Sequence, residues 1–134
     1  MIEISSYIWD TGALTLFFAD HDEAKTLMRE VKSGQSNGLV PSLILSEFYY
    51  KTWQKFGNQA AQVRTISLRE NLLEILELEN DDIFQIGELK IKNNVLSLAD
   101  CVILTIAKRT KSTILTTDDP LNAIAGVKSK KLDF

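Results

Sequence analysis

Residues 97–109, SLADCVILTIAKR, constrain the fold of this chain most strongly, because they form an almost unbroken apolar run with one carboxylate, Asp100, near its start. An ionised carboxylate among apolar side chains is costly unless it is paired, hydrogen-bonded or holding a metal. Two interpretations follow. Either Asp100 caps a helix at the surface, or it belongs to a cluster of groups that requires negative charge. Cys101, the single cysteine, lies in the same run and is expected to be a small core residue of a protein in the reducing cytoplasm.

The composition is typical of one soluble globular domain spanning residues 1–134. No apolar run reaches the roughly 18 residues that a membrane span requires, and the amino-terminal segment lacks the basic region of a signal peptide. The net charge of −3 argues against non-specific binding to nucleic acid. That argument fails if several acids converge on divalent cations, because phosphate then becomes a favourable ligand.

The scarcity of histidine and cysteine excludes several kinds of site. His21 is the only histidine, so a zinc site or a Cys–His dyad is disfavoured, and a Ser-His-Asp triad would depend on a histidine in a polar loop. Neither a P-loop motif nor the glycine fingerprint of dinucleotide-binding folds occurs. The remaining chemistry is carried by carboxylates.

Strand-like and helix-like segments alternate along the chain. Strands are expected at residues 2–10, 37–41, 72–79, 112–117 and near 130–134. Helices are expected to begin near residue 11 and to span 22–33, 42–57, 58–70, 81–94 and 97–110. This order predicts an α/β fold, a three-layer α/β/α sandwich with a central, mainly parallel sheet. Ligands of such sheets bind beyond the carboxyl ends of the strands.

Four carboxylates are expected at that edge of the sheet. Asp10 closes the first strand, Asp118 with Asp119 closes the strand at 112–117, and Glu47 and Asp100 lie near the starts of helices that begin at the same edge. Each acid alone has an ordinary alternative as a turn residue, a helix cap, a first-turn acid or a solvated side chain. Their convergence favours a functional site whose mutual repulsion is offset by Mg²⁺ or Mn²⁺.

Four segments, YIWDTGALTLFF, PSLILSEFYYK, LSLADCVILTIAKR and TILTTDDPL, resemble PIN-domain ribonucleases of the VapC toxin type, in the family's order and over essentially the whole chain. The resemblance implies that Asp10, Glu47, Asp100 and Asp118 form an acidic cluster that binds Mg²⁺ or Mn²⁺ and cleaves RNA. Supporting positions would be Thr11, Thr116 and Asp119. It also implies a homodimer, a cognate antitoxin partner and no membrane association. The bound metal would polarise a phosphodiester oxygen and lower the pKa of a water molecule.

Other functions are left open by the sequence. The chain could be a PIN-domain nuclease of RNA processing without a toxin role, or an RNA-binding PIN domain that has lost activity. A haloacid-dehalogenase-like phosphatase would need a second aspartate where Gly12 stands. A receiver-like phospho-acceptor domain would need an acceptor aspartate at the end of a middle strand. The segment TTDDPL also lacks the aromatic residue that follows in many relatives of the VapC type.

The segment FYYKTW, residues 48–53, places Tyr49, Tyr50 and Trp53 on the helix expected at 42–57. We expect these aromatic side chains to belong to the core. The alternative is an exposed surface for a dimer partner or an antitoxin.

Overall fold

The centre of the computed structural model, which describes residues 4–118, 121, 124 and 126–133, is a five-stranded parallel sheet. Its strands are β1 (Ser5–Trp9), β2 (Ser36–Pro41), β3 (Glu74–Leu76), β4 (Thr113–Thr116) and β5 (Ser129–Lys131), in the order β3-β2-β1-β4-β5. The first strand of the chain is therefore the middle strand of the sheet, and Ile8 and Trp9 at its end are fully buried. The predicted α/β class is confirmed.

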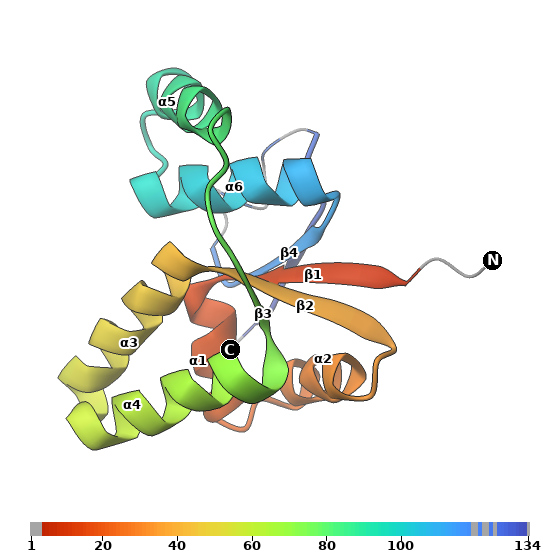
Figure 1. Ribbon diagram of the computed structural model, residues 1–134, viewed down its shortest axis with the longest axis vertical. Helices are drawn as coiled ribbons and strands as arrows, with labels where there is room; N and C mark the ends of the chain where they lie inside the picture. Colours follow the sequence, from red (N-terminus) through yellow and green to blue (C-terminus); the bar gives the residue numbers. More distant parts are fainter. Residues whose placement is uncertain (1–3, 119–120, 122–123, 125, 134) are drawn as a thin grey trace.

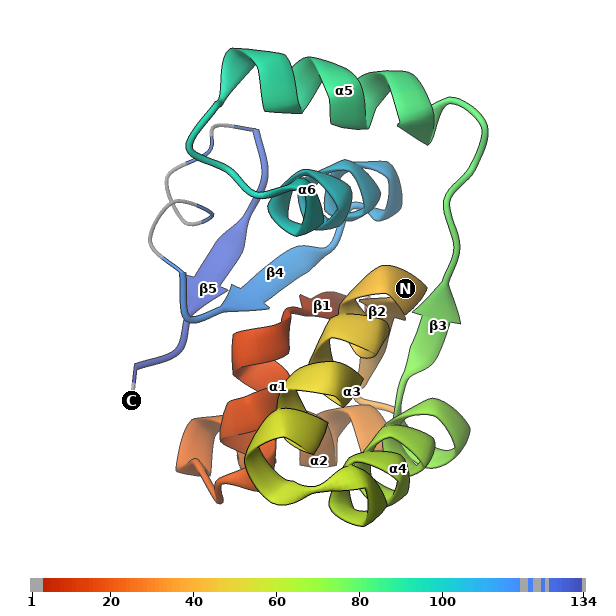
Figure 2. The same cartoon turned by 90° about the vertical axis from the view of Figure 1, so that its left-hand side faces the viewer.

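Helices cover both faces of the sheet (Figures 1 and 2). One face carries α1 (Thr11–Phe18), α2 (Asp22–Lys32), α3 (Ser42–Phe56) and α4 (Asn58–Ser67), and the other carries α5 (Asp82–Lys92) and α6 (Leu98–Thr110). The predicted three layers are present. No described helix is both long enough and apolar enough to cross a bilayer.

Helix α6 is the apolar run that opened the sequence analysis. Residues 101–107 are all buried, Cys101 among them, as expected. The helix begins with a capping box: Ser97 accepts a hydrogen bond from the backbone of Asp100, and the Asp100 carboxylate accepts one from the backbone of Ser97. It ends at Lys111 in the left-handed conformation. Because α6 runs back toward the start of β4, its first turn lies at the carboxyl edge of the sheet.

The chain between α4 and β3 differs from the prediction of a helix over 58–70 followed by a strand over 72–79. Helix α4 ends at Ser67, a π-helical turn η1 (Leu68–Leu72) follows, and β3 is only three residues long. Leu73 donates its backbone N–H to Leu68 across this wider turn, at 2.8 Å. A π turn brings residues five apart onto nearly the same side, so both leucines are buried.

Tyr50 and Trp53 contradict the expectation of a core position. Their side chains are 48% and 50% exposed, whereas Phe48 is buried. The buried face of α3 consists of Ile44, Leu45, Phe48 and Thr52. These residues pack against the core, and Tyr50 and Trp53 lie outside that face. Tyr49 is half-buried, and its hydroxyl accepts a hydrogen bond from Asn58 at 2.8 Å.

Candidate active site

The carboxyl edge of the sheet holds a cavity of about 490 Å³. Strand β1 ends next to it, and the backbone N–H of Asp10 still donates to Leu115 of β4 at 3.1 Å, which holds the two strand ends together. The four carboxylates singled out by the sequence all line this cavity: Asp10, Glu47, Asp100 and Asp118. They come from four separate segments of the chain, which parallel topology brings to one edge.

Asp10 is the most buried of these acids, with 8% of its surface exposed. Its carboxylate caps α1 by accepting the backbone N–H of Ala13 at 2.8 Å, and it is also hydrogen-bonded by the hydroxyl of Thr116. Burial raises the pKa of Asp10 to about 6 against the opposing effect of these two hydrogen bonds, and the nearby charges of Asp118 and Asp100 raise it further. The carboxylates of the site therefore repel one another, and burial adds to the cost of ionising Asp10.

Glu47 reaches the cavity from the second turn of α3. Its carboxylate accepts a hydrogen bond from the hydroxyl of Thr11, the first residue of α1. Thr11 is itself buried, so this bond joins the starts of two helices across the site. The contact places Thr11 beside the cluster, as the sequence suggested, while its role there stays a prediction.

Asp100 is a helix cap, as the first interpretation predicted, and it also lines the cavity, while its part in a cluster that requires negative charge stays a prediction. Its carboxylate caps α6 through the bond from Ser97, at 3.1 Å, and the same residue lines the cavity. Asp118 follows β4, where its backbone N–H donates to the hydroxyl of Thr116 at 2.9 Å. Thr116 thus contacts both Asp10 and Asp118. Asp119, the remaining supporting residue, lies outside the described residues.

The carboxylates share the cavity, but no three acids, histidines or cysteines of the described residues are arranged to hold one ion directly. The carboxylates of Asp10 and Asp100 accept hydrogen bonds at the starts of α1 and α6, and that of Glu47 accepts one from Thr11 across the site. Mg²⁺ or Mn²⁺ would here be held by one or two carboxylates and otherwise through water, since Mg²⁺ keeps several of its waters in protein sites. The donors that line the cavity are carboxylate and hydroxyl oxygens, which are the ligands such hard cations prefer.

Sequence reasoning missed several residues that line the cavity: Gly12, Thr15, Lys51, Ser97 and Thr117. A side chain at Gly12 would place its Cβ 2.1 Å from the hydroxyl of Thr117, so glycine allows α1 to begin close to the segment after β4. The signal for Lys51 was its position four residues after Glu47, which puts both on one helix face.

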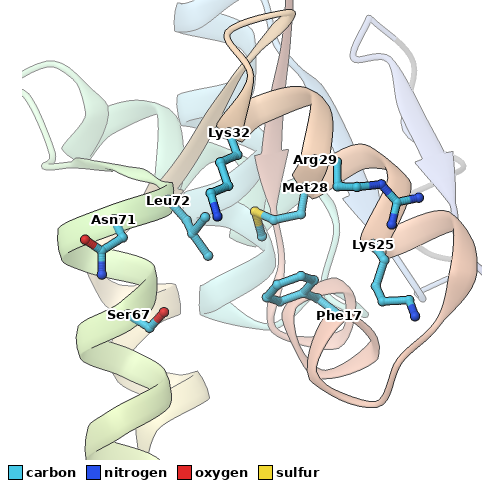
Figure 3. A pocket seen from close by; sticks show the side chains of 8 residues that line it. All are labelled: Phe17, Lys25, Met28, Arg29, Lys32, Ser67, Asn71 and Leu72. Atoms are coloured by element: carbon cyan, nitrogen blue, oxygen red, sulfur yellow. The ribbon is translucent and has the colours of Figure 1, made fainter.

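A second hollow, of about 600 Å³, lies between α2 and η1 (Figure 3). Three basic side chains of α2 line it, those of Lys25, Arg29 and Lys32, and Asn71 of η1 lies opposite them. Apolar side chains lie between them: Phe17, Met28 and Leu72. No carboxylate of the described residues lines this groove, so its chemistry is opposite to that of the acidic cavity.

The fold and the cavity together define an α/β protein whose candidate active site is built from acidic side chains at the carboxyl edge of a parallel sheet. The model of the PIN-domain family matches residues 7–127, and the chain belongs to that family. No curated protein matches the chain significantly in sequence.

Solved structures share this fold at low sequence identity. VapBC2 from Rickettsia felis, bound to a promoter DNA fragment, superposes with a TM-score of 0.80 at 17% identity, over 96% of this chain and 99% of the other. DNA-bound VapBC from Salmonella typhimurium gives 0.77 at 15% identity, over 96% and 98%. VapC20 from Mycobacterium tuberculosis, described as a toxin that cleaves the sarcin-ricin loop, gives 0.71 at 15% identity, over 90% and 95%.

Proposed function

We propose that this chain is a metal-dependent endoribonuclease and the toxin of a VapBC-type toxin–antitoxin pair. The observation that carries the proposal is the meeting of four carboxylates from separate segments in one cavity, with the pKa of Asp10 raised to about 6. The fold shared with a toxin that cleaves the sarcin-ricin loop supports RNA as the substrate class. A chain of this family without a toxin role, or without activity, is the alternative that the experiment below separates.

The residues of the cavity would have two roles in hydrolysis, holding the metal ion and positioning the carboxylates. Asp10, Asp100, Asp118 and Glu47 would hold Mg²⁺ or Mn²⁺, directly or through water, and the ion when bound supplies Lewis-acid chemistry at the phosphodiester. Thr11 holds the Glu47 carboxylate toward the cavity, and Thr116 holds that of Asp10. No protein nucleophile is required, which agrees with a cavity whose described lining contains neither histidine nor cysteine.

The decisive experiment is digestion of single-stranded and structured RNA with and without Mg²⁺ or Mn²⁺. The intact chain should cleave only with metal, and Asp100→Asn should lose more than about 100-fold in rate. Asp22→Asn is the matched control, because Asp22 is an exposed first-turn acid of α2 outside the cavity. Cleavage by Asp100→Asn at the rate of the control would refute the assignment. Growth arrest on expression, relieved by Asp100→Asn, would separate the toxin from a processing nuclease.

An antitoxin partner is part of this proposal, supported by the VapBC and FitAcB complexes that share the fold. The groove of Figure 3 suits an acidic amphipathic segment, because its apolar centre is flanked by Lys25, Arg29 and Lys32. Arg29→Glu should weaken binding of a product encoded beside this gene while leaving RNA cleavage intact. Equal binding by Arg29→Glu would remove the groove from the proposal.

A second copy of the chain is the other proposed partner. Helix α5 and the segment after it expose a row of apolar side chains, with Phe84 75%, Ile91 86% and Val95 86% exposed. Gly87 lies between Phe84 and Ile91, and an added Cβ there meets no atom within 4 Å, so the helix offers an open face. We expect a dimer by light scattering, and a monomer when Phe84 is replaced by Glu. A monomeric intact chain would refute this part.

A further inference from the structure

The acidic cavity contains one basic side chain among the described residues that line it, that of Lys51. Ile44, Glu47 and Lys51 lie three and four residues apart on α3, so they form one face of the helix, and all three line the cavity. Lys51 lies about 6 Å further along the helix axis than Glu47. The cavity therefore carries negative charge at the sheet edge and a positive charge further along α3.

Lys51 does not neutralise Glu47. The four-residue spacing allows an ion pair, as Glu88 and Lys92 on α5 show: their charged groups are 2.5 Å apart. The Glu47 carboxylate instead accepts the hydroxyl of Thr11, and the exposed Lys51 ammonium makes no hydrogen bond or ion pair within the described part of the chain. Among the described residues, the Lys51 ammonium therefore lines the same cavity as the four carboxylates without being paired to Glu47.

The opposite wall of the cavity is formed by residues of α1. Helices α1 and α3 pack against each other, and both lead away from the sheet edge (Figures 1 and 2). Thr11 stands opposite Glu47, and Thr15, one turn further along α1, also lines the cavity with an exposed side chain. The cavity therefore has an acidic end at the sheet and a second part, along α1 and α3, whose cation is the Lys51 ammonium; the Thr15 hydroxyl there donates to the backbone carbonyl of Thr11 at 2.9 Å.

We propose that Lys51 binds the RNA phosphate next to the scissile one, with the strand extending from the acidic cluster along the groove between α1 and α3. The inference rests on the proposed nuclease function and adds the direction of the substrate strand. Lysine binds phosphate as a point charge, and an exposed ammonium does so without losing another partner. The contact is sequence-independent, so it contributes affinity and register rather than base choice.

The test compares Lys51→Met with Lys51→Arg and with a matched control, Lys55→Met. Lys55 lies one turn further along α3, is exposed, and packs its ammonium over the Phe56 ring at 5.4 Å, outside the cavity. Binding of a fluorescent single-stranded RNA is measured by anisotropy at several salt concentrations in the Asp100→Asn background, and gels check that the RNA stays intact. Steady-state cleavage is measured in the otherwise intact chain.

Lys51→Met should weaken RNA binding about tenfold at low salt and lower the slope of log K against log salt by about 0.7. Its KM should rise by a similar factor while kcat stays within about twofold. Lys51→Arg should retain most of the affinity, and Lys55→Met should match the parent. An unchanged slope and affinity in Lys51→Met would overturn the inference while leaving the nuclease proposal standing. An intact chain that binds RNA in a Lys51-dependent manner but never cleaves it would overturn the nuclease proposal alone, and absence of RNA binding would overturn both.

Discussion

Replacing Asp10 with Asn should stabilise the metal-free protein. Asp10 is buried, and the pKa of its carboxyl is about 6 in the folded chain, against 3.8 for the exposed group. Ionised Asp10 therefore opposes folding. This difference between the two pKa values corresponds to about 3 kcal/mol of folding free energy at pH values above the folded pKa. That figure is the upper limit of the stability that a neutral side chain at this position can add.

Asparagine preserves the local structure around this position. It is as good an N-cap as aspartate, so its oxygen can still accept the Ala13 N–H. Its amide can donate to the hydroxyl of Thr116, whose second lone pair can accept it. The neutral side chain also removes the repulsion from Asp118 and Asp100. The expected result is a gain of about 1–3 kcal/mol, below the limit because the buried Thr116 hydroxyl loses its acceptor, or roughly 3–10 °C in melting temperature for a chain of this size.

The sign of the pH dependence follows from linkage. Because the folded pKa of Asp10 is raised, the folded state binds the proton more tightly than the unfolded chain, and the stability of the intact protein falls as pH rises from 3.8 through about 6. The advantage of Asp10→Asn should therefore be absent below about pH 4 and complete above about pH 7. Urea unfolding in EDTA, followed by circular dichroism at pH 4.0, 5.5 and 7.5, measures it.

Asp100→Asn is the matched comparison, because the same chemical change there removes a favourable first-turn charge from α6 rather than a buried one. We expect it to destabilise the protein by less than about 1 kcal/mol. Added Mg²⁺ should stabilise the intact protein by mass action and narrow its gap to Asp10→Asn. An Asp10→Asn protein that is no more stable than the intact chain at pH 7.5 in EDTA would refute the reasoning from burial.

Three further substitutions test the scaffold, each by urea unfolding. His21→Ala removes the N-cap of α2 and the bond from its ring to the backbone of Asp133, and should cost about 1 kcal/mol; an unchanged midpoint would contradict that role. Arg109→Met leaves the buried carboxylate of Asp82 without its ion pair and should cost about 3–5 kcal/mol, part of which Asp82→Asn should restore. Gly38→Ala places a Cβ 2.7 Å from the Leu73 side chain and 2.8 Å from that of Val31 and should cost about 1–3 kcal/mol, whereas a neutral effect would mean that these side chains can move aside.

The sequence predicted most of the local structure and the four carboxylates that line the acidic cavity, apart from the segment between α4 and β3. Alternation of strand-like and helix-like segments predicted the parallel sheet and its three layers, because each pattern buries apolar surface in only one way. Asp10, Glu47, Asp100 and Asp118 could be chosen because each stands where a strand ends or a helix begins, and in parallel topology these places share an edge. The start of α6 was also readable, since Ser97 and Asp100 have the spacing of a helix cap.

Side-chain pairing and exposure depended on tertiary structure. Tyr50 and Trp53 are exposed because the stripe through Ile44 and Phe48 fills the core contacts of α3, and residue type alone does not reveal which stripe is used. Likewise, the hydrogen bond to the Glu47 carboxylate comes from Thr11, thirty-six positions earlier in the chain, and not from Lys51, which has the spacing of a helical ion pair.

Local patterns thus determined which residues stand at the edge of the sheet, because helix and strand periods are properties of neighbouring residues. The packing of α1 against α3 brings Thr11 to Glu47, and the pairing of β1 with β4 brings Asp10 to Thr116. Such contacts join segments far apart in the chain, and their energies depend on distances that exist only in the folded protein.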